Sequence, residues 1–64
     1  MMTHDEQNAF ENGRAVFAVA VRRGWNAVTA ADKWGYAPGS GPEWFAFLDG
    51  FHTERLAAKK GTKS

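Results

Sequence analysis

Apolar and small residues recur every three or four positions in the first third of the chain. This spacing places one set of residues on a single face of a helix: Phe10, Gly13, Phe17, Ala20 and Val21. Thr3 and Glu6 have the spacing of a capping box, which predicts the start of this helix, and Gly24 predicts its end. We therefore expect a helix over residues 4–23. Val16 and Val19 fall outside the apolar face, so the second half of this helix needs covering on two sides.

A second long helix is predicted over residues 42–60. Ser40 and Glu43 repeat the capping-box spacing, and Pro42 falls in the first turn, where its missing amide hydrogen costs nothing. The apolar face of this helix contains Trp44, Phe47, Leu48 and Phe51, with Phe45 and Leu56 at its margins. Before it, residues 36–42 form a loop rich in proline and glycine. Thr29 with Asp32 predicts a short helical turn that continues to Trp34.

Each long helix has a glycine in its interior, Gly13 and Gly50, and each costs about 1 kcal/mol relative to alanine. Alanines lie on the same helix faces as these glycines: Ala9 and Ala20 with Gly13, Ala46 and Ala57 with Gly50. One explanation is that two backbones approach each other at the glycines; the other is that exposed glycines are tolerated. We favour the first. It predicts an all-α fold, an antiparallel two-helix hairpin with a short helical turn in the connection.

The length of 64 residues predicts one small helical domain spanning residues 1–64, with a frayed tail over residues 57–64 or 61–64. A core of this size is marginal, so we expect a partner or self-association. The longest apolar run, residues 15–21, is too short to cross a bilayer, and residues before it are acidic, unlike a secretory leader. These features, with the absence of cysteine, predict a cytoplasmic protein.

The residues that nucleophilic catalysis requires are missing from this sequence. Ser40 is better used as a helix cap, and the loop of residues 38–41 lacks the lysine and hydroxyl of a phosphate-binding loop. Asp49 and His52 are one helical turn apart, but no further ligand accompanies them at metal-binding spacing. His4 offers less still. We therefore expect no enzymatic activity, no metal and no cofactor.

Charge is nearly balanced, with eight Lys and Arg against seven Asp and Glu. Acidic residues begin each predicted helix and basic residues end it, as helix dipoles favour. In an antiparallel hairpin the C-terminal lysines would then lie beside the acidic start of the first helix. The candidate phosphate contacts for a nucleic acid are the remaining arginines and one lysine: Arg14, Arg22, Arg23, Lys33 and Arg55.

Three aromatic residues, Trp25, Trp34 and Tyr36, cluster in the connection between the long helices. Two roles are open for these aromatic residues. They can cover the open side of a two-helix hairpin, which otherwise lacks a third layer. Alternatively, they can anchor a protein partner or stack on bases. We expect covering to dominate, with at least one tryptophan left for an interface.

Residues 39–51 resemble the ribosome modulation factor superfamily of very short helical proteins. Phe47, Gly50 and Phe51 stand where that family has an aromatic-x-x-Gly-aromatic helix, and Ala9 with Gly13 matches its first-helix pattern. The resemblance covers about two-thirds of the chain. It implies a helical hairpin and association with the small ribosomal subunit during translational silencing, and it extends to relatives in phage and plasmid genomes.

Two functions follow as hypotheses. The first is a non-enzymatic, ribosome-associated RNA-binding protein that regulates translation. The second is a protein–protein effector, for example a phage-encoded inhibitor, that binds a host protein through Trp25, Trp34 and Tyr36. A homodimer that completes the core is compatible with either, and neither requires a membrane.

Overall fold

The structure is a computed structural model. It describes the backbone of residues 3–61 and the side chains through residue 59. Within this range the chain forms three helices and no strand: α1 (His4–Arg23), α2 (Ala27–Lys33) and α3 (Pro42–Gly61). The predicted all-helical class and the bounds of the first long helix are confirmed, and the second long helix ends one residue later than predicted. The part of the predicted frayed tail that follows Gly61 lies outside the described residues.

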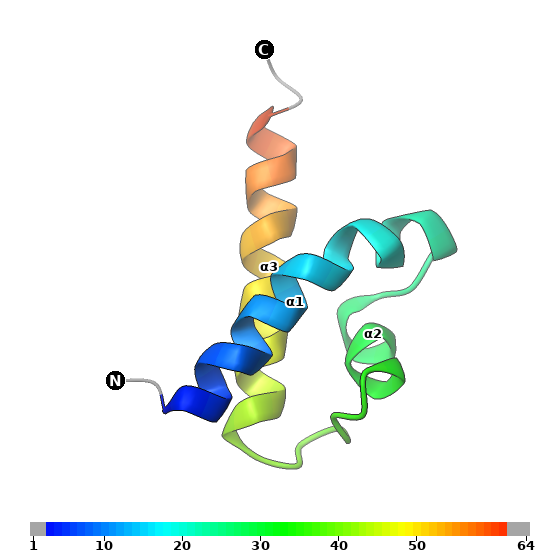
Figure 1. The fold of residues 1–64 in the computed structure, drawn as a ribbon. Coiled ribbons are helices and arrows are strands. Elements are labelled where there is room, and N and C mark those ends of the chain that lie inside the picture. Colours follow the sequence, from blue (N-terminus) through cyan, green and yellow to red (C-terminus); the bar gives the residue numbers. More distant parts are fainter. Residues whose placement is uncertain (1–2, 62–64) are drawn as a thin grey trace.

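The two long helices cross one another near their middles (Figure 1). Both begin in the lower part of the view and rise toward the upper part, so the expected antiparallel arrangement is not confirmed. The connection, which includes α2, instead carries the chain from the end of α1 back down to the start of α3. As a result, the basic ends of both helices lie in the upper part of the view, away from their acidic starts.

The ends of α1 are set by local chemistry that the sequence predicts. The Thr3 hydroxyl accepts a hydrogen bond from the Glu6 amide at 3.2 Å, and the Glu6 carboxylate accepts one from the Thr3 amide at 2.7 Å. At the other end, Gly24 adopts a left-handed conformation with φ of 74°. Its amide donates to the carbonyls of Ala20 and Val21, which closes the last turn. The capping box and the glycine stop are both confirmed.

The caps of α2 and α3 differ from the prediction. Asn26, not Thr29, caps α2, because its side-chain oxygen accepts the Thr29 amide at 2.7 Å. The helix therefore starts three residues earlier than a Thr29 cap would place it. Gly41, not Ser40, directly precedes α3, and its carbonyl accepts the amide of Trp44 at 3.1 Å.

The crossing of α1 and α3 is a contact between backbones. Gly13 and Gly50 are both buried. A Cβ placed on Gly13 would overlap the carbonyl oxygen of Phe47 and approach the Phe51 amide nitrogen to 2.9 Å. A Cβ placed on Gly50 would overlap the carbonyl oxygen of Phe10 in the same way. The prediction that the glycines mark a close approach of the two helices is confirmed.

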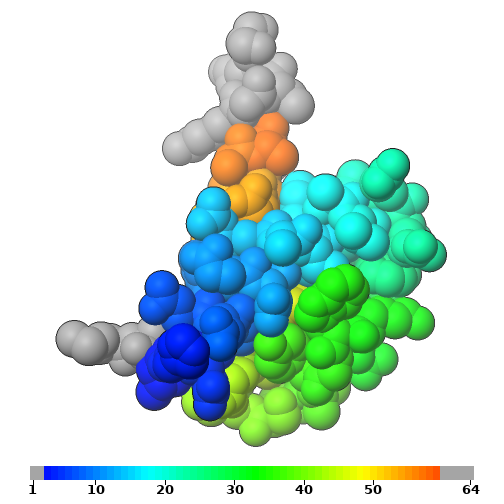
Figure 2. All heavy atoms as spheres, viewed as in Figure 1, coloured from blue at the N-terminus to red at the C-terminus, as the bar shows by residue number. Residues whose placement is uncertain are grey.

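The core around this crossing is built mainly from small side chains. Its buried residues are Ala9, Val16, Ala20, Ala30, Ala31, Ala46, Phe47 and Phe51. Phe47 and Phe51 supply the bulk, and Phe17 meets Phe51 edge to face with ring centroids 5.1 Å apart. Figure 2 shows α1 and the segment around α2 lying over α3 on this side of the molecule. The core therefore combines a close approach of two helix backbones at the glycines with two large aromatic side chains.

One part of the predicted apolar face of α1 is wrong. Val16 is 1% exposed although its position falls outside that face, whereas Val21, which belongs to it, is 60% exposed. The buried face follows Ala9, Gly13, Val16 and Ala20. Most residues of this buried face are small, because the face must come close to α3. The size of the side chains, and not only their hydrophobicity, therefore determines which face of α1 is buried.

We expect Gly13→Ala to lower the free energy of unfolding by about 2–3 kcal/mol, because overlap with the Phe47 carbonyl outweighs the gain of about 1 kcal/mol in helix propensity. Urea denaturation followed by circular dichroism measures this change. The matched control is Ala18→Gly at an exposed position of α1, where only the propensity cost of about 1 kcal/mol should appear. An unchanged or raised stability of Gly13→Ala would contradict the backbone contact.

Candidate nucleic-acid interface

Trp25 is the centre of a basic cluster where α1 ends. The backbone turns at Gly24, and the Trp25 amide then donates to the Ala20 carbonyl at 2.8 Å, which fixes the start of the connection against α1. The half-buried Trp25 side chain packs against the core. The Arg23 guanidinium lies 5.6 Å from the centroid of its ring, and the Lys33 ammonium lies 5.8 Å from it. The ring thus joins cations from the ends of α1 and α2.

We define the Trp25 cluster as Arg22, Arg23, Trp25 and Lys33. Each cation–π contact at such a site contributes about 0.5–1 kcal/mol and limits the rotamers of a long side chain. Arg23 and Lys33 lie no more than about 12 Å apart, because each is within 6 Å of one ring centroid. Arg22 is exposed in the same last turn of α1 and belongs to no ion pair among the described residues. The cluster is a concentration of positive charge on a nearly neutral chain.

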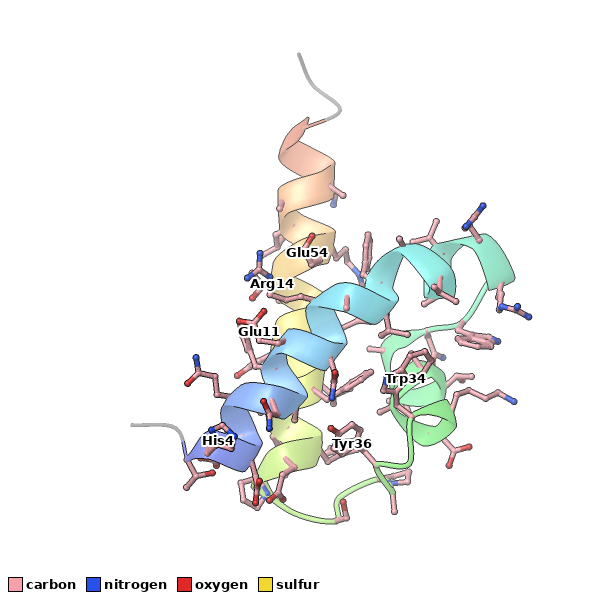
Figure 3. All side chains as sticks on the ribbon, viewed as in Figure 1. His4, Glu11, Arg14, Trp34, Tyr36 and Glu54 are labelled. Atoms are coloured by element: carbon pink, nitrogen blue, oxygen red, sulfur yellow. The ribbon has the colours of Figure 1, made fainter. Side chains whose placement is uncertain are left out.

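Arg14 lies elsewhere and is engaged by acids. Its Nε donates to Glu54 at 2.8 Å, and its guanidinium also lies 3.7 Å from Glu11 (Figure 3). The hydrogen bond and the negative charge of Glu54, with a smaller contribution from Glu11, raise the pKa of Arg14. This guanidinium therefore spans the crossing of α1 and α3 and is a poor candidate for a phosphate contact.

Arg55 also lies outside the Trp25 cluster. It is exposed on α3, with its guanidinium 5.7 Å from the centroid of the Phe51 ring. The five predicted phosphate contacts thus fall into three places: three join the Trp25 cluster, one bridges the long helices, and one lies over a core aromatic of α3.

The three aromatics of the connection have different surroundings. Tyr36 packs its ring 5.2 Å from that of Phe47, and its hydroxyl accepts a hydrogen bond from Asn12 at 3.1 Å. Trp25 likewise packs against the core. Trp34, the C-terminal cap residue of α2, is 46% exposed (Figure 3). Two of the three residues cover the core, and Trp34 is the one whose surface is open to a partner.

Sequence reasoning missed Asn12 and Glu54, which position Tyr36 and Arg14. Each lies on a different element from the residue it holds, at separations of 24 and 40 residues, so no local spacing indicates the contact. It also missed the buried indole nitrogen of Trp44, which has no hydrogen-bond partner among the described residues. Trp44 instead meets Phe45 edge to face at 4.8 Å.

The described residues hold no group of three or more His, Asp or Glu side chains arranged to bind a metal ion. Asp49 and His52 are both exposed on α3, and His4 is exposed at the start of α1. Within the described range, no helix has the length and apolar character that a membrane crossing requires.

No protein-family model matches this chain, and neither a curated protein nor a solved structure matches it. The resemblance to the ribosome modulation factor superfamily therefore remains a prediction from the residues that suggest it.

We expect Tyr36→Ala and Trp34→Ala to differ in their effect on stability. Tyr36→Ala removes a ring packed on Phe47 and should lower the free energy of unfolding by about 2–3 kcal/mol. Trp34→Ala removes a more exposed ring and should cost about 1 kcal/mol or less. Far-UV circular dichroism in urea is the appropriate measurement, because Trp34→Ala also removes a fluorophore. Equal losses would show that Trp34 supports the core as Tyr36 does.

Proposed function

We propose that the chain is a non-enzymatic binding protein that contacts RNA on the ribosome and regulates translation, with Arg22, Arg23 and Lys33 as its phosphate contacts. The observation that carries the proposal is the pair of cations, Arg23 and Lys33, over the ring of Trp25. Phosphate contacts by lysine and arginine supply most of the affinity of such proteins.

The role of Trp25 in this proposal is to position charge. Ordering a flexible side chain at an interface costs about 0.5–1.5 kcal/mol, and a contact that restricts the side chain beforehand reduces that cost. Arg23 and Lys33 are restricted by the ring before any ligand arrives. They come from different helices, so α1 and α2 together set the distance between the two charges.

The helix arrangement keeps acidic helix ends away from the Trp25 cluster, which an antiparallel hairpin would not do. Because α1 and α3 both begin in the lower part of Figure 1, Asp5, Glu6 and Glu43 belong to helix ends far from the Trp25 cluster. Their negative charges therefore lie away from the cluster, and Asp32, which directly precedes Lys33 on α2, is the acidic residue nearest to it in the sequence. The resemblance to the ribosome modulation factor superfamily supports the ribosome as the place where this RNA binding occurs.

We expect binding to a single-stranded RNA to weaken with added salt, with a slope of log affinity against log salt of about −2 for three phosphate contacts. Arg23→Gln and Lys33→Gln should each reduce that slope by about 0.7, measured by fluorescence anisotropy with labelled RNA. Arg14→Gln is the matched control, because its guanidinium is engaged by Glu54 and Glu11, and it should leave the slope unchanged.

Co-sedimentation with bacterial ribosomes at low salt tests the setting of this function. Wild-type chain should pellet with ribosomes, and Arg23→Gln should pellet less. Absence of the wild-type chain from the pellet at low salt would contradict the proposal, as would equal salt slopes for wild type, Arg23→Gln and Lys33→Gln.

A second candidate function, a protein–protein effector, is favoured by the exposure of Trp34. Exposed tryptophans are frequent anchors of protein interfaces, and loss of such an anchor costs about 2 kcal/mol or more. Capture from a bacterial lysate with and without ribonuclease separates the two. An RNA-binding protein loses its partners after ribonuclease, whereas an effector keeps one that tolerates salt and is lost in Trp34→Ala.

A further inference from the structure

The face of α3 that points away from α1 carries two exposed apolar side chains with an acid and a histidine between them. Phe47, Gly50 and Phe51 face α1 at the crossing. On the opposite side of the helix, Phe45 is 58% exposed and Leu56 is 47% exposed. The set that shares this face, which we call the outer face of α3, is Phe45, Asp49, His52 and Leu56, all of them exposed.

The order of chemistry along the outer face is symmetric about the midpoint between Gly50 and Phe51. An apolar residue stands at each end, Phe45 and Leu56, and the acid–base pair Asp49 and His52 stands at the centre. A sequence with this symmetry is complementary to a second copy of itself running in the opposite direction. If the two copies ran in the same direction, Asp49 would lie opposite Asp49, and repulsion between the like charges would disfavour that arrangement.

We propose that two copies of this chain associate through the outer face of α3, with the two α3 helices antiparallel and related by a two-fold axis between Gly50 and Phe51. In that register Phe45 of each copy lies opposite Leu56 of the other, and Asp49 of each copy lies opposite His52 of the other. Each pair occurs twice, as a two-fold interface requires. The order of Asp49 and His52 along the outer face, and not only its apolar side chains, indicates that the partner bound there is a second copy of this chain.

The interface is small. It uses one face of one helix, well below the area of a standard stable complex, so the dimer should dissociate on dilution. Burial of Phe45 and Leu56 supplies the attraction, and the two Asp49–His52 pairs set the direction. The Trp25 cluster takes no part in this contact, so the dimer and the proposed RNA binding hold or fail independently.

Charge reversal tests the register. Sedimentation equilibrium near pH 6, from about 10 µM to about 1 mM, measures the dimer dissociation constant. Asp49→Lys should weaken the dimer about tenfold, and His52→Glu should do the same, because two opposite-charge pairs become two like-charge pairs. The double variant Asp49→Lys, His52→Glu should return to within about twofold of wild type. Asp32→Lys on α2 is the matched control and should have no effect.

Cross-linking tests the direction. The chain has no cysteine, so introduced thiols report one contact only. At about 1 mM, the double variant Phe45→Cys, Leu56→Cys should form a disulfide-linked dimer under mild oxidation. Each thiol at position 45 then lies opposite the thiol at position 56 of the partner copy, and the two Asp49–His52 pairs remain to set the direction of the encounter. Phe45→Cys alone and Leu56→Cys alone should not, since like positions lie at opposite ends of the interface. A monomer at the highest concentration, or single variants that cross-link as readily as the double variant, would overturn the proposal.

Discussion

The close approach of two helix backbones at Gly13 and Gly50 is the constraint on which the rest of this structure depends. Each glycine lies against a carbonyl group of the other helix, at a distance that leaves no room for a methyl group. The glycines weaken both helices, each by about 1 kcal/mol, and the dense contact that they allow offsets that cost. Because the backbones themselves fill the centre, alanines are sufficient around it, and Phe47 and Phe51 complete a core that a chain of 64 residues can build.

The direction of the crossing determines what the surface offers. With both long helices rising from the same end of the molecule, the connection must travel back along them, and α2 is formed on the way. This return brings Lys33 to the same indole ring as Arg23. It also leaves the outer face of α3 uncovered by any described element, with Phe45 and Leu56 exposed. A positive cluster and an apolar face therefore arise on separate parts of one small fold.

Much of the fold could be predicted from local sequence chemistry. The capping box of Thr3 and Glu6, the stop at Gly24 and the proline at the start of α3 are short-range signals, and they define both long helices. The two interior glycines indicated the crossing because they were costly without one. The prediction for α2 overlooks Asn26, a stronger N-cap residue than Thr29. The prediction for α3 chooses Ser40, the stronger capping residue, whereas Gly41 is the residue that directly precedes the helix.

Local sequence chemistry could not predict the direction of the crossing or the ion pairs of Arg14. Nothing in the spacing of α1 or α3 distinguishes the two directions, since a glycine contact is compatible with both. The sequence does not separate Arg14 from the other cations, because its partner, Glu54, is 40 residues away. The basic residues near Trp25 were recognised as candidates, but only the fold shows that two of them share one ring.

A double-mutant cycle on Gly13→Ala and Gly50→Ala tests the backbone contact most directly. Urea denaturation gives the four free energies of unfolding, with an excluded osmolyte added to all samples if the variants are too unstable. One added methyl group already forces the helices apart, so the double variant should lose little more stability than a single one, with a coupling of about 1 kcal/mol or more. Losses that add to within about 0.5 kcal/mol would mean that the two glycines do not share one contact.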